Sequence, residues 1–228
     1  MVKSMIEICN ITKKFEHFTC LDHVSMTIPD GMIYGLVGEN GAGKSTLLRL
    51  IAGVYRADEG EIRVDGERIP SVAAKSKIFY MPDSQYYEKN ATPLTIGNFY
   101  RTFYPEFAME EYRYLLEQFG LDEGALVDTF SKGMKKQMFI GAAICANTGY
   151  LLCDEVFDGL DPQIRSTVND LLKHTAAGRN MTILIVSHYL EELDKICNMQ
   201  GFLHRGRILG KEEWDGLALK GRGEDEKD

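Results

Sequence analysis

Residues 38–45 read G-E-N-G-A-G-K-S and fit the pattern G-x-x-x-x-G-K-[ST], which makes strict demands on the elements beside it. The apolar run at residues 32–37 predicts a short buried strand before it. The apolar spacing of residues 47–51 predicts a helix after it, ending at Gly53. An accidental glycine-rich turn is the alternative, and these flanking signals weaken it. We therefore expect an α/β protein whose first helix starts at this turn.

Strand and helix signals alternate again in the last third of the chain. Apolar runs at residues 150–153 and 182–186 predict buried strands, and Asp161 followed by Pro162 predicts a helix start between them. Buried strands that alternate with helices are typical of a parallel sheet covered on both faces. Residues 61–69 contain an Asp-Gly turn between apolar residues and predict an antiparallel hairpin.

The middle of the chain, at about residues 84–147, reads as a helical subdomain. Tyr112, Leu115, Leu116 and Phe119 have the spacing of one helix face. We expect a single domain over residues 1–228. Its end, residues 221–228, is almost all charge and glycine and is expected to be a disordered tail.

The net charge of 26 − 34 = −8 excludes a general attraction to nucleic acid or anionic lipid. Five widely spaced cysteines without a C-x-x-C pair favour reduced thiols and argue against a zinc site. The N-terminus lacks the apolar core of a signal peptide. The longest apolar stretch, near residues 139–146, is far shorter than the roughly 20 residues of a membrane span. We expect a cytoplasmic protein that reaches the membrane only through a partner.

The glycine-rich run predicts a site for the phosphates of a nucleotide. Glycines let successive N–H groups turn inward around an anion, and the helix start adds its positive end. Lys44 supplies a charge for the β- and γ-phosphates, and Ser45 offers a hydroxyl to Mg²⁺. The residues expected to bind the nucleotide here are Gly38, Glu39, Asn40, Gly41, Ala42, Gly43, Lys44, Ser45 and Thr46.

Two carboxylates, Asp154 and Glu155, follow the apolar run at residues 150–153. An acid at such a strand end can hold the Mg²⁺ shell, and a second acid can activate water. We assign Asp154 to the metal and Glu155 to the water. Without the glycine-rich run, a solvated strand end would be the better reading of this pair.

These motifs, with those that follow, resemble the ATP-binding subunits of ABC transporters over nearly the whole chain and in the family's order. Residues 130–135, F-S-K-G-M-K, resemble the family's signature motif, which is L-S-G-G-Q in its common form. The resemblance implies that Ser131 and Gly133 contact the nucleotide held by a second subunit.

Three further residues acquire roles from the resemblance. Residues 159–161 resemble the D-loop, which brings Asp161 to the nucleotide. His188, after the apolar run at 182–186, resembles the switch histidine at the γ-phosphate, with a purely structural histidine as the alternative. Phe15 falls where the family stacks an aromatic ring on adenine, and a core phenylalanine is the alternative.

One position departs from the family's pattern. A glutamine normally follows a run such as the F-Y-M-P of residues 79–82, but this chain has Asp83, and Gln85 comes two residues later. Aspartate is a good ligand for Mg²⁺, so we expect Asp83 near the metal. A plain turn residue after proline is the alternative.

The segment from residue 86 to residue 119 is dense in aromatic residues. Most are expected to fill the core of the helical subdomain. A few are expected to face a helix of a membrane partner. We choose Tyr86, Tyr87 and Phe99 for that role because they lie near position 83, where the family normally has glutamine.

The resemblance implies a P-loop NTPase core with a parallel sheet, an N-terminal antiparallel β lobe and a helical subdomain. It implies a subunit that hydrolyses ATP with Mg²⁺, pairs with a second nucleotide-binding subunit, identical or not, and powers a separate permease at the cytoplasmic face of the membrane. Exporters of the ABC-2 kind match the variant motifs best. The alternatives are an ATP-dependent clamp or regulator of the same family and, as a weaker fit, a small P-loop kinase.

Overall fold

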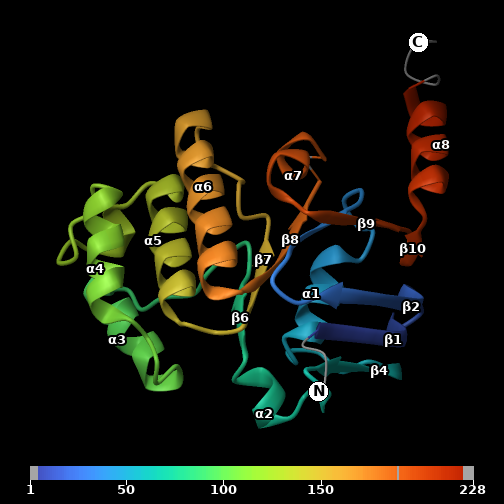
Figure 1. The fold of residues 1–228 in the computed structure, drawn as a ribbon, viewed down its shortest axis with the longest axis horizontal. Coiled ribbons are helices and arrows are strands. Elements are labelled where there is room, and N and C mark those ends of the chain that lie inside the picture. The colour runs from blue at the N-terminus through green and yellow to red at the C-terminus, as the bar shows by residue number, and fades with distance from the viewer. Residues whose placement is uncertain (1–4, 189, 223–228) are drawn as a thin grey trace.

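The computed structural model describes residues 5–188 and 190–222. A six-stranded sheet lies at the centre of the molecule (Figure 1). Neighbouring strands are parallel except for β10, which pairs antiparallel with β9. This arrangement confirms the expected α/β fold with a parallel sheet. In spatial order the strands are β10 (Arg207–Leu209), β9 (Met199–His204), β3 (Ile33–Val37), β8 (Thr182–Ser187), β7 (Tyr150–Asp154) and β6 (Ile78–Met81).

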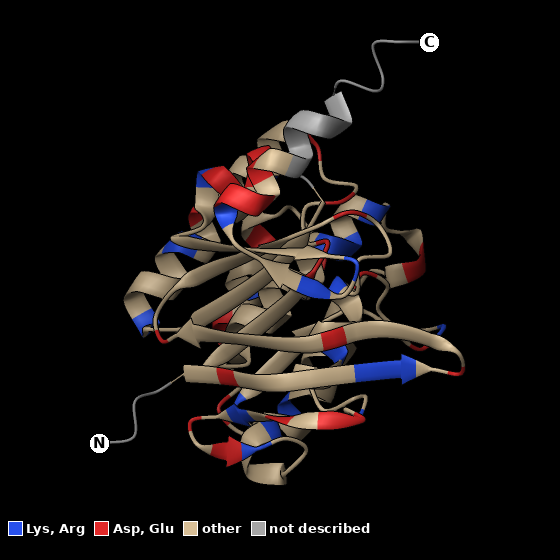
Figure 2. Cartoon of the chain, turned by 90° about the vertical axis from the view of Figure 1, so that its right-hand side faces the viewer, with Lys and Arg blue, Asp and Glu red and all other residues tan. Residues whose placement is uncertain are grey.

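A second, antiparallel sheet is formed by the N-terminal part of the chain (Figure 2). The expected hairpin is present, because Val64 pairs with Glu67 around a turn in which Asp65 and Gly66 have positive φ angles. In spatial order the strands are β2 (Phe18–Pro29), β1 (Met5–Phe15), β4 (Glu59–Val64) and β5 (Glu67–Arg68).

The two faces of the central sheet bury different partners. Side chains of a strand alternate between faces, so Tyr34 and Leu36 of β3 pack in one apolar cluster with α1 and the antiparallel sheet. Ile33 and Val37 of the same strand pack in the other cluster with α5, α6 and α7. The helices outside the helical subdomain are α1 (Lys44–Ile51), α2 (Val72–Lys75), α6 (Pro162–Arg179), α7 (Leu190–Ile196) and α8 (Lys211–Arg222).

Local signals account for several of these boundaries. Asp161 caps α6, since its carboxylate accepts the backbone N–H groups of Gln163 and Ile164 at 3.0 Å each. Gly53 has a φ of 68° just after α1. Of the expected tail, residues 221 and 222 belong to α8, and residues 223–228 lie outside the described residues.

Helices make up most of the segment between β6 and β7, and they form the left-hand end of the molecule in Figure 1. Tyr112 lies at their centre, with its side chain completely buried. A Cβ at Gly97 would come within 2.9 Å of the Tyr112 ring, and one at Gly141 within 3.5 Å. Two glycines therefore let neighbouring helices approach this ring. The elements are α3 (Pro93–Phe103), α4 (Met109–Gln118), a 3₁₀ turn η1 (Val127–Thr129) and α5 (Lys132–Cys145).

All five cysteines are free, and three of them are buried. In the described residues, no helix combines the length and the apolar character that a membrane crossing requires.

The Tyr112 hydroxyl allows a test of the packing. Among the described residues it has no hydrogen-bond partner, and burial raises its pKa. A buried polar group without a partner costs roughly 1–3 kcal/mol, so Tyr112→Phe should leave the free energy of unfolding unchanged or raise it. Gly97→Ala should lower it, because the methyl group would collide with the ring. Urea unfolding of both variants measures this, and a clear loss of stability in Tyr112→Phe would contradict it.

Candidate functional site

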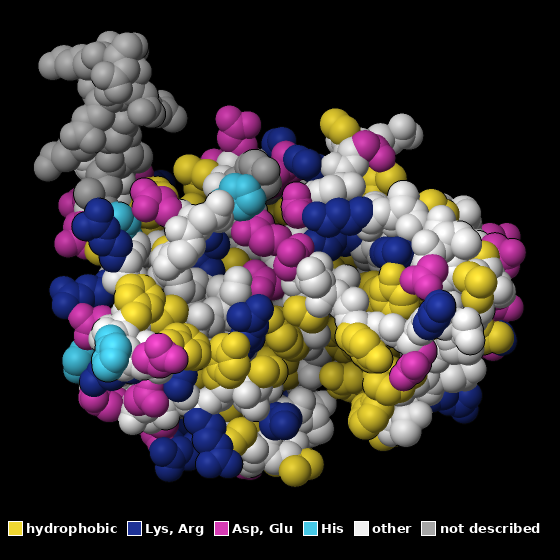
Figure 3. Space-filling model, turned by 180° about the vertical axis from the view of Figure 1, so that it is seen from behind, with side chains coloured by type: hydrophobic (Ala, Val, Ile, Leu, Met, Phe, Trp, Pro, Cys, Tyr) yellow, Lys and Arg dark blue, Asp and Glu magenta, His cyan; other side chains and the backbone are white. Residues whose placement is uncertain are grey.

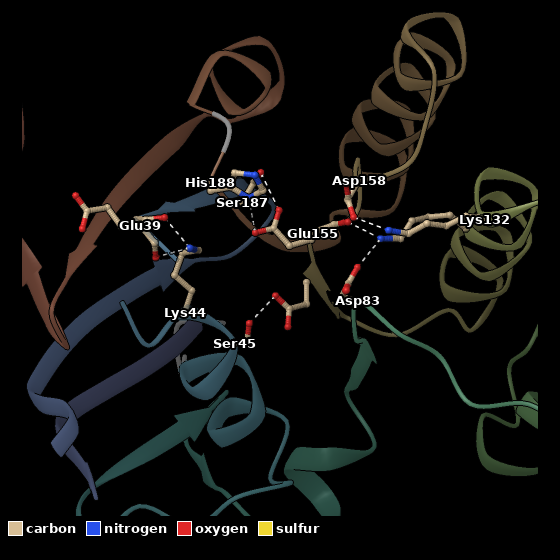
Figure 4. A network of polar contacts seen from close by, with 12 residues as sticks. Glu39, Lys44, Ser45, Asp83, Lys132, Glu155, Asp158, Ser187 and His188 are labelled. Carbon is tan, nitrogen blue, oxygen red and sulfur yellow. Dashed lines mark hydrogen bonds and ion pairs between the residues drawn. The ribbon is translucent and has the colours of Figure 1, made fainter. Parts of the chain in front are cut away.

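Loops from four parallel strands meet at one edge of the central sheet (Figure 4). The carboxyl ends of parallel strands lie together, so residues far apart in the sequence become neighbours there. These are the loop from Gly38 to Gly43 after β3, Asp83 after β6, Asp154 and Glu155 at β7, and Ser187 and His188 at β8.

The glycine-rich loop is tightly packed on one side and open on the other. Gly41 and Gly43 have φ angles of 81° and 105°, in the left-handed region that favours glycine. A Cβ on Gly43 would lie 2.7 Å from Leu21, and one on Gly38 would lie 2.3 Å from the carbonyl oxygen of Leu203. A Cβ on Gly41 would have no atom within 4 Å. The backbone is thus fixed from behind while its open side stays accessible to a ligand.

The helix α1 begins directly at this loop. In the described part of the chain no side chain caps its start at Gly43. The first N–H groups of a helix have no partner within the helix, and together with the positive end of the helix dipole they attract anions. A phosphate at this position would supply the missing acceptors.

Lys44 lies with its ammonium group against the loop, and only 6% of the residue is exposed. Its Nζ donates to the carbonyl oxygens of Gly38 at 2.6 Å and Glu39 at 3.0 Å. Burial lowers the pKa of Lys44, and the nearby carboxylates of Glu155 and Asp154 oppose that shift. An ammonium has three donors, so a phosphate oxygen can take the third.

The residues at the expected metal position fit Mg²⁺. The Ser45 hydroxyl donates to Oδ1 of Asp154 at 3.0 Å, and both groups offer the hard oxygen that this ion prefers. Mg²⁺ is commonly held by one or two carboxylates plus substrate phosphates and water. The described residues contain no group of three or more His, Cys, Asp or Glu that could hold a metal. Nucleotide phosphates and water would supply the other ligands of a Mg²⁺ ion bound by Ser45 and Asp154.

The carboxylate of Glu155 is held by the last residue of β8 and the residue that follows it. Ser187 donates from Oγ to Oε2 at 3.2 Å, and Nδ1 of His188 lies 3.0 Å from Oε1 (Figure 4). Its backbone has a φ of 49°, which is unusual for a residue other than glycine. The carboxylate is thereby aimed into the space at the sheet edge.

The candidate signature motif and D-loop form one continuous surface. Ser131 caps α5 by accepting the N–H of Met134 at 3.2 Å. A Cβ on Gly133 would lie 3.3 Å from the carbonyl oxygen of Gly159. Lys132 and Asp158 form an ion pair at 2.6 Å, on the opposite side of the site from Lys44 (Figure 4).

Two expected nucleotide contacts have other partners in this structure. The carboxylate of Asp161 caps α6 as described above. Phe15 ends β1 with 40% exposure, in an edge-on contact with Tyr55 at 5.6 Å between ring centres. Their contacts with a nucleotide stay predictions, as do those of the glycine-rich loop, Ser131, Gly133 and His188.

Asp83 forms an ion pair with Lys136, at 3.2 Å from Oδ1 to Nζ. It also lies close enough to Asp154 to raise the pKa of that carboxyl. Its place in a metal shell stays a prediction. Lys136 was not among the residues predicted from the sequence. It lies four residues before Ile140, on the apolar face of a helix, and this spacing was the available signal.

The burial of Asp154 predicts an effect on stability. Burial, together with the neighbouring Glu155, raises its pKa above the ordinary value of 3.8. When folding raises the pKa of an acid, the free energy of unfolding falls as the pH rises from the ordinary pKa to the raised one. It stays lower at any higher pH. Asp154→Asn removes the charge and keeps an acceptor for Ser45. We expect a higher Tm at pH 7 without Mg²⁺, and a smaller difference between pH 4 and pH 7.

The matched control is Asp158→Asn. The hydrogen bond from Lys132 lowers the pKa of Asp158, so this change should leave Tm equal or lower. A similar fall in Tm for both variants would contradict the account of Asp154.

Comparison with known proteins identifies the family. A family model described as ABC transporter matches residues 21–158. The ABC transporter ATP-binding protein YtrB of Bacillus subtilis (strain 168) is 35% identical over 216 residues, covering 93% of this chain and 73% of YtrB. The methionine import ATP-binding protein MetN of Wolinella succinogenes is 34% identical, and the match covers 88% of this chain and 70% of MetN. The Nod factor export ATP-binding protein I of Sinorhizobium fredii is 33% identical, and the match covers 90% of this chain and 61% of that protein.

Solved structures agree in fold. The structure of an ATP-binding subunit of an ABC transporter superposes with a TM-score of 0.84 at 24% identity, covering 96% of this chain and 95% of the other. A bacterial Atm1-family ABC exporter with ATP bound superposes with a TM-score of 0.83 at 21% identity. The match covers 99% of this chain and 42% of the exporter chain. Because the family model spans more than half of the chain and the relatives match nearly all of it, the chain belongs to the ABC transporter family, as an ATP-binding subunit of the kind that hydrolyses ATP.

Proposed function

We propose that this chain hydrolyses MgATP to power export through a separate membrane permease. The observation that carries the proposal is the carboxylate of Glu155. It is held by Ser187 and His188 at the sheet edge that also carries Lys44 and Asp154. A base beside a phosphate-binding loop has the placement that hydrolysis of a nucleotide requires.

Different residues of the site bind the phosphates, hold the metal and accept the proton. Lys44 and the N–H groups at the start of α1 bind the β- and γ-phosphates. Ser45 and Asp154 hold Mg²⁺, which when bound offsets phosphate charge. Glu155 accepts a proton from the attacking water, and Ser187 and His188 keep its carboxylate in place.

A second subunit completes the site. The glycine-rich loop covers one side of a triphosphate and leaves the other side open. Ser131 and Gly133 belong to the surface that contains Lys132 and Asp158, on the far side of the site from Lys44 (Figure 4). Two chains that pair head-to-tail would place this surface over the partner's γ-phosphate. The alternative of a small kinase has no use for such a surface.

An apolar groove in the helical subdomain is the proposed contact with the permease. It has a volume of about 500 Å³ and is lined by residues 86–91 with Thr95, Ile96 and Phe99. Tyr86 is 86% exposed and Phe99 is 57% exposed, whereas Tyr87 lies against Phe139 with 6.3 Å between ring centres. Hydrophobic side chains also gather beside a hollow in Figure 3. A helix with an apolar face fits such a groove.

We propose that the chain serves export and not import. We also propose that its partner is a membrane permease, and that the chain is not a clamp or regulator. The variant motif at residues 130–135 and Asp83 resemble the ABC-2 exporters, and one relative is named for export. Another relative of similar identity is named for methionine import, so the direction needs its own measurement. A regulator or clamp of the same family would keep the nucleotide site but would not purify with a membrane protein of several spans.

Glu155→Gln tests the proposed chemistry. The amide keeps the shape of the side chain but cannot accept the proton, so ATP hydrolysis should fall about 10²–10⁴-fold. ATP should still bind by calorimetry, and ATP-bound dimers should accumulate on a sizing column. Lys44→Ala serves as the contrast, because it should weaken ATP binding itself.

Adding Ser131→Arg to Glu155→Gln should abolish the dimer while ATP binding to the monomer persists. Near-native turnover in Glu155→Gln would remove the assignment of the base. A dimer that survives Ser131→Arg would remove the shared site.

Phe99→Ser tests the groove. Loss of a buried aromatic anchor commonly weakens an interface about tenfold or more. We expect reduced co-purification with a permease expressed from a neighbouring gene, with basal ATP hydrolysis unchanged. Tyr114→Ser is the matched control, because Tyr114 is an aromatic residue of α4 outside the groove with a similar exposure of 58%. Equal co-purification of both variants would rule out the groove as the contact.

A further inference from the structure

Lys136 is a buried charge that the proposed chemistry does not use. It lies in the second turn of α5, and 2% of its side chain is exposed. The residues that follow it in α5, Gln137 to Cys145, are all buried. Removing an ammonium from water is costly unless close partners compensate it. The identity of those partners therefore indicates what the lysine stabilises.

Lys136 contacts two of the loops at the sheet edge. Its Nζ donates to the backbone carbonyl oxygen of Glu155 at 2.5 Å and lies 3.2 Å from Oδ1 of Asp83. One side chain of α5 thus connects the loop after β6 with the loop after β7.

The contact with Glu155 falls on an unusual piece of backbone. Glu155 has a φ of 49°, which a residue with a Cβ adopts only when its surroundings hold it. Its N–H donates to the carbonyl oxygen of Val186 at 3.0 Å. Its own carbonyl oxygen accepts from Lys136. The backbone is therefore fixed on both sides, by β8 and by α5.

From this geometry we propose that Lys136 is a positioning residue for Glu155, and that Asp83 is the counterion that keeps the ammonium of Lys136 in place. This inference rests on the proposed role of Glu155 as the base. Lys136 fixes the direction of the Glu155 carbonyl group, and the carboxylate on the same residue then points at Ser187 and His188. Lys136 acts through the backbone of Glu155 and takes no part in the proton transfer itself.

The position of Asp83 fits this role. Its side chain is 46% exposed, so one side of the carboxylate contacts water while Oδ1 faces the buried ammonium of Lys136. A neutral glutamine at this position would leave the ammonium with a carbonyl oxygen as its partner and no opposite charge. The departure from the family's pattern at residue 83 thereby acquires a physical reason within this chain.

Lys136→Met is the first test, since methionine keeps an unbranched apolar side chain and removes the donor. Misplacement of a catalytic group by about 1 Å can cost about 10²-fold. We expect kcat for ATP hydrolysis to fall about tenfold or more, while the Kd for MgATP changes less than about twofold. Lys173→Met, which changes an exposed lysine of α6, is the matched control and should leave both constants unchanged. An unchanged kcat in Lys136→Met would overturn the proposal.

A double-mutant cycle separates positioning from a general loss of structure. If Lys136 acts through the carboxylate of Glu155, adding Lys136→Met to Glu155→Gln should cause no further loss in single-turnover rate. A further loss as large as in the native background would overturn the proposal. If Glu155→Gln alone keeps near-native turnover, the proposed function and this inference both fail. If only Glu155→Gln is slow, the inference alone fails.

Asp83→Asn provides a second test that spares the core, because the changed side chain is half exposed. Loss of the counterion should lower kcat and leave unchanged the Mg²⁺ concentration that gives half-maximal rate. A raised Mg²⁺ requirement would place Asp83 in the metal shell and overturn its role as counterion. This test remains decisive if Lys136→Met fails to fold.

Discussion

The parallel alignment of β3, β6, β7 and β8 is the constraint on which the site depends. It brings the carboxyl ends of these strands to one edge, so the glycine-rich loop, Asp83, Glu155 and His188 become neighbours without any long loop. The same alignment requires both faces of the sheet to be covered, because its strands are buried on each side. The two apolar clusters, one with α1 and one with α5 and α6, meet this requirement.

Three features that are costly for folding lie at that edge. Lys44 is a nearly buried cation, Asp154 is a nearly buried acid with a raised pKa, and Glu155 has a left-handed backbone. Each is unfavourable for folding alone. Together they leave charges and donors oriented toward a space that a charged ligand can enter, which is the usual relation between strain and function.

Much of this arrangement could be predicted from the sequence. Strands such as β7 and β8 are marked by apolar runs, and Asp161 caps its helix with a carboxylate, so each signal lies within a few residues. The glycine-rich loop is likewise a local pattern. The pair formed by Asp83 and Lys136 joins residues 53 positions apart, and it depends on how α5 lies against β6. Periodicity predicts that a helix face is buried, but it does not say which neighbour compensates a charge on that face.

The link between Asp83 and Lys136 has a consequence for exchanging parts between relatives. The helical subdomain contributes the lysine, whereas the loop after the core strand β6 contributes the aspartate. A chimera that takes its helices from this chain and its core from a relative with glutamine at position 83 would inherit an uncompensated buried charge. An exchangeable module is therefore defined by which residues are paired with each other, and not only by the loops at which the chain is cut. Residues 83 and 136 form a unit that has to be transplanted together.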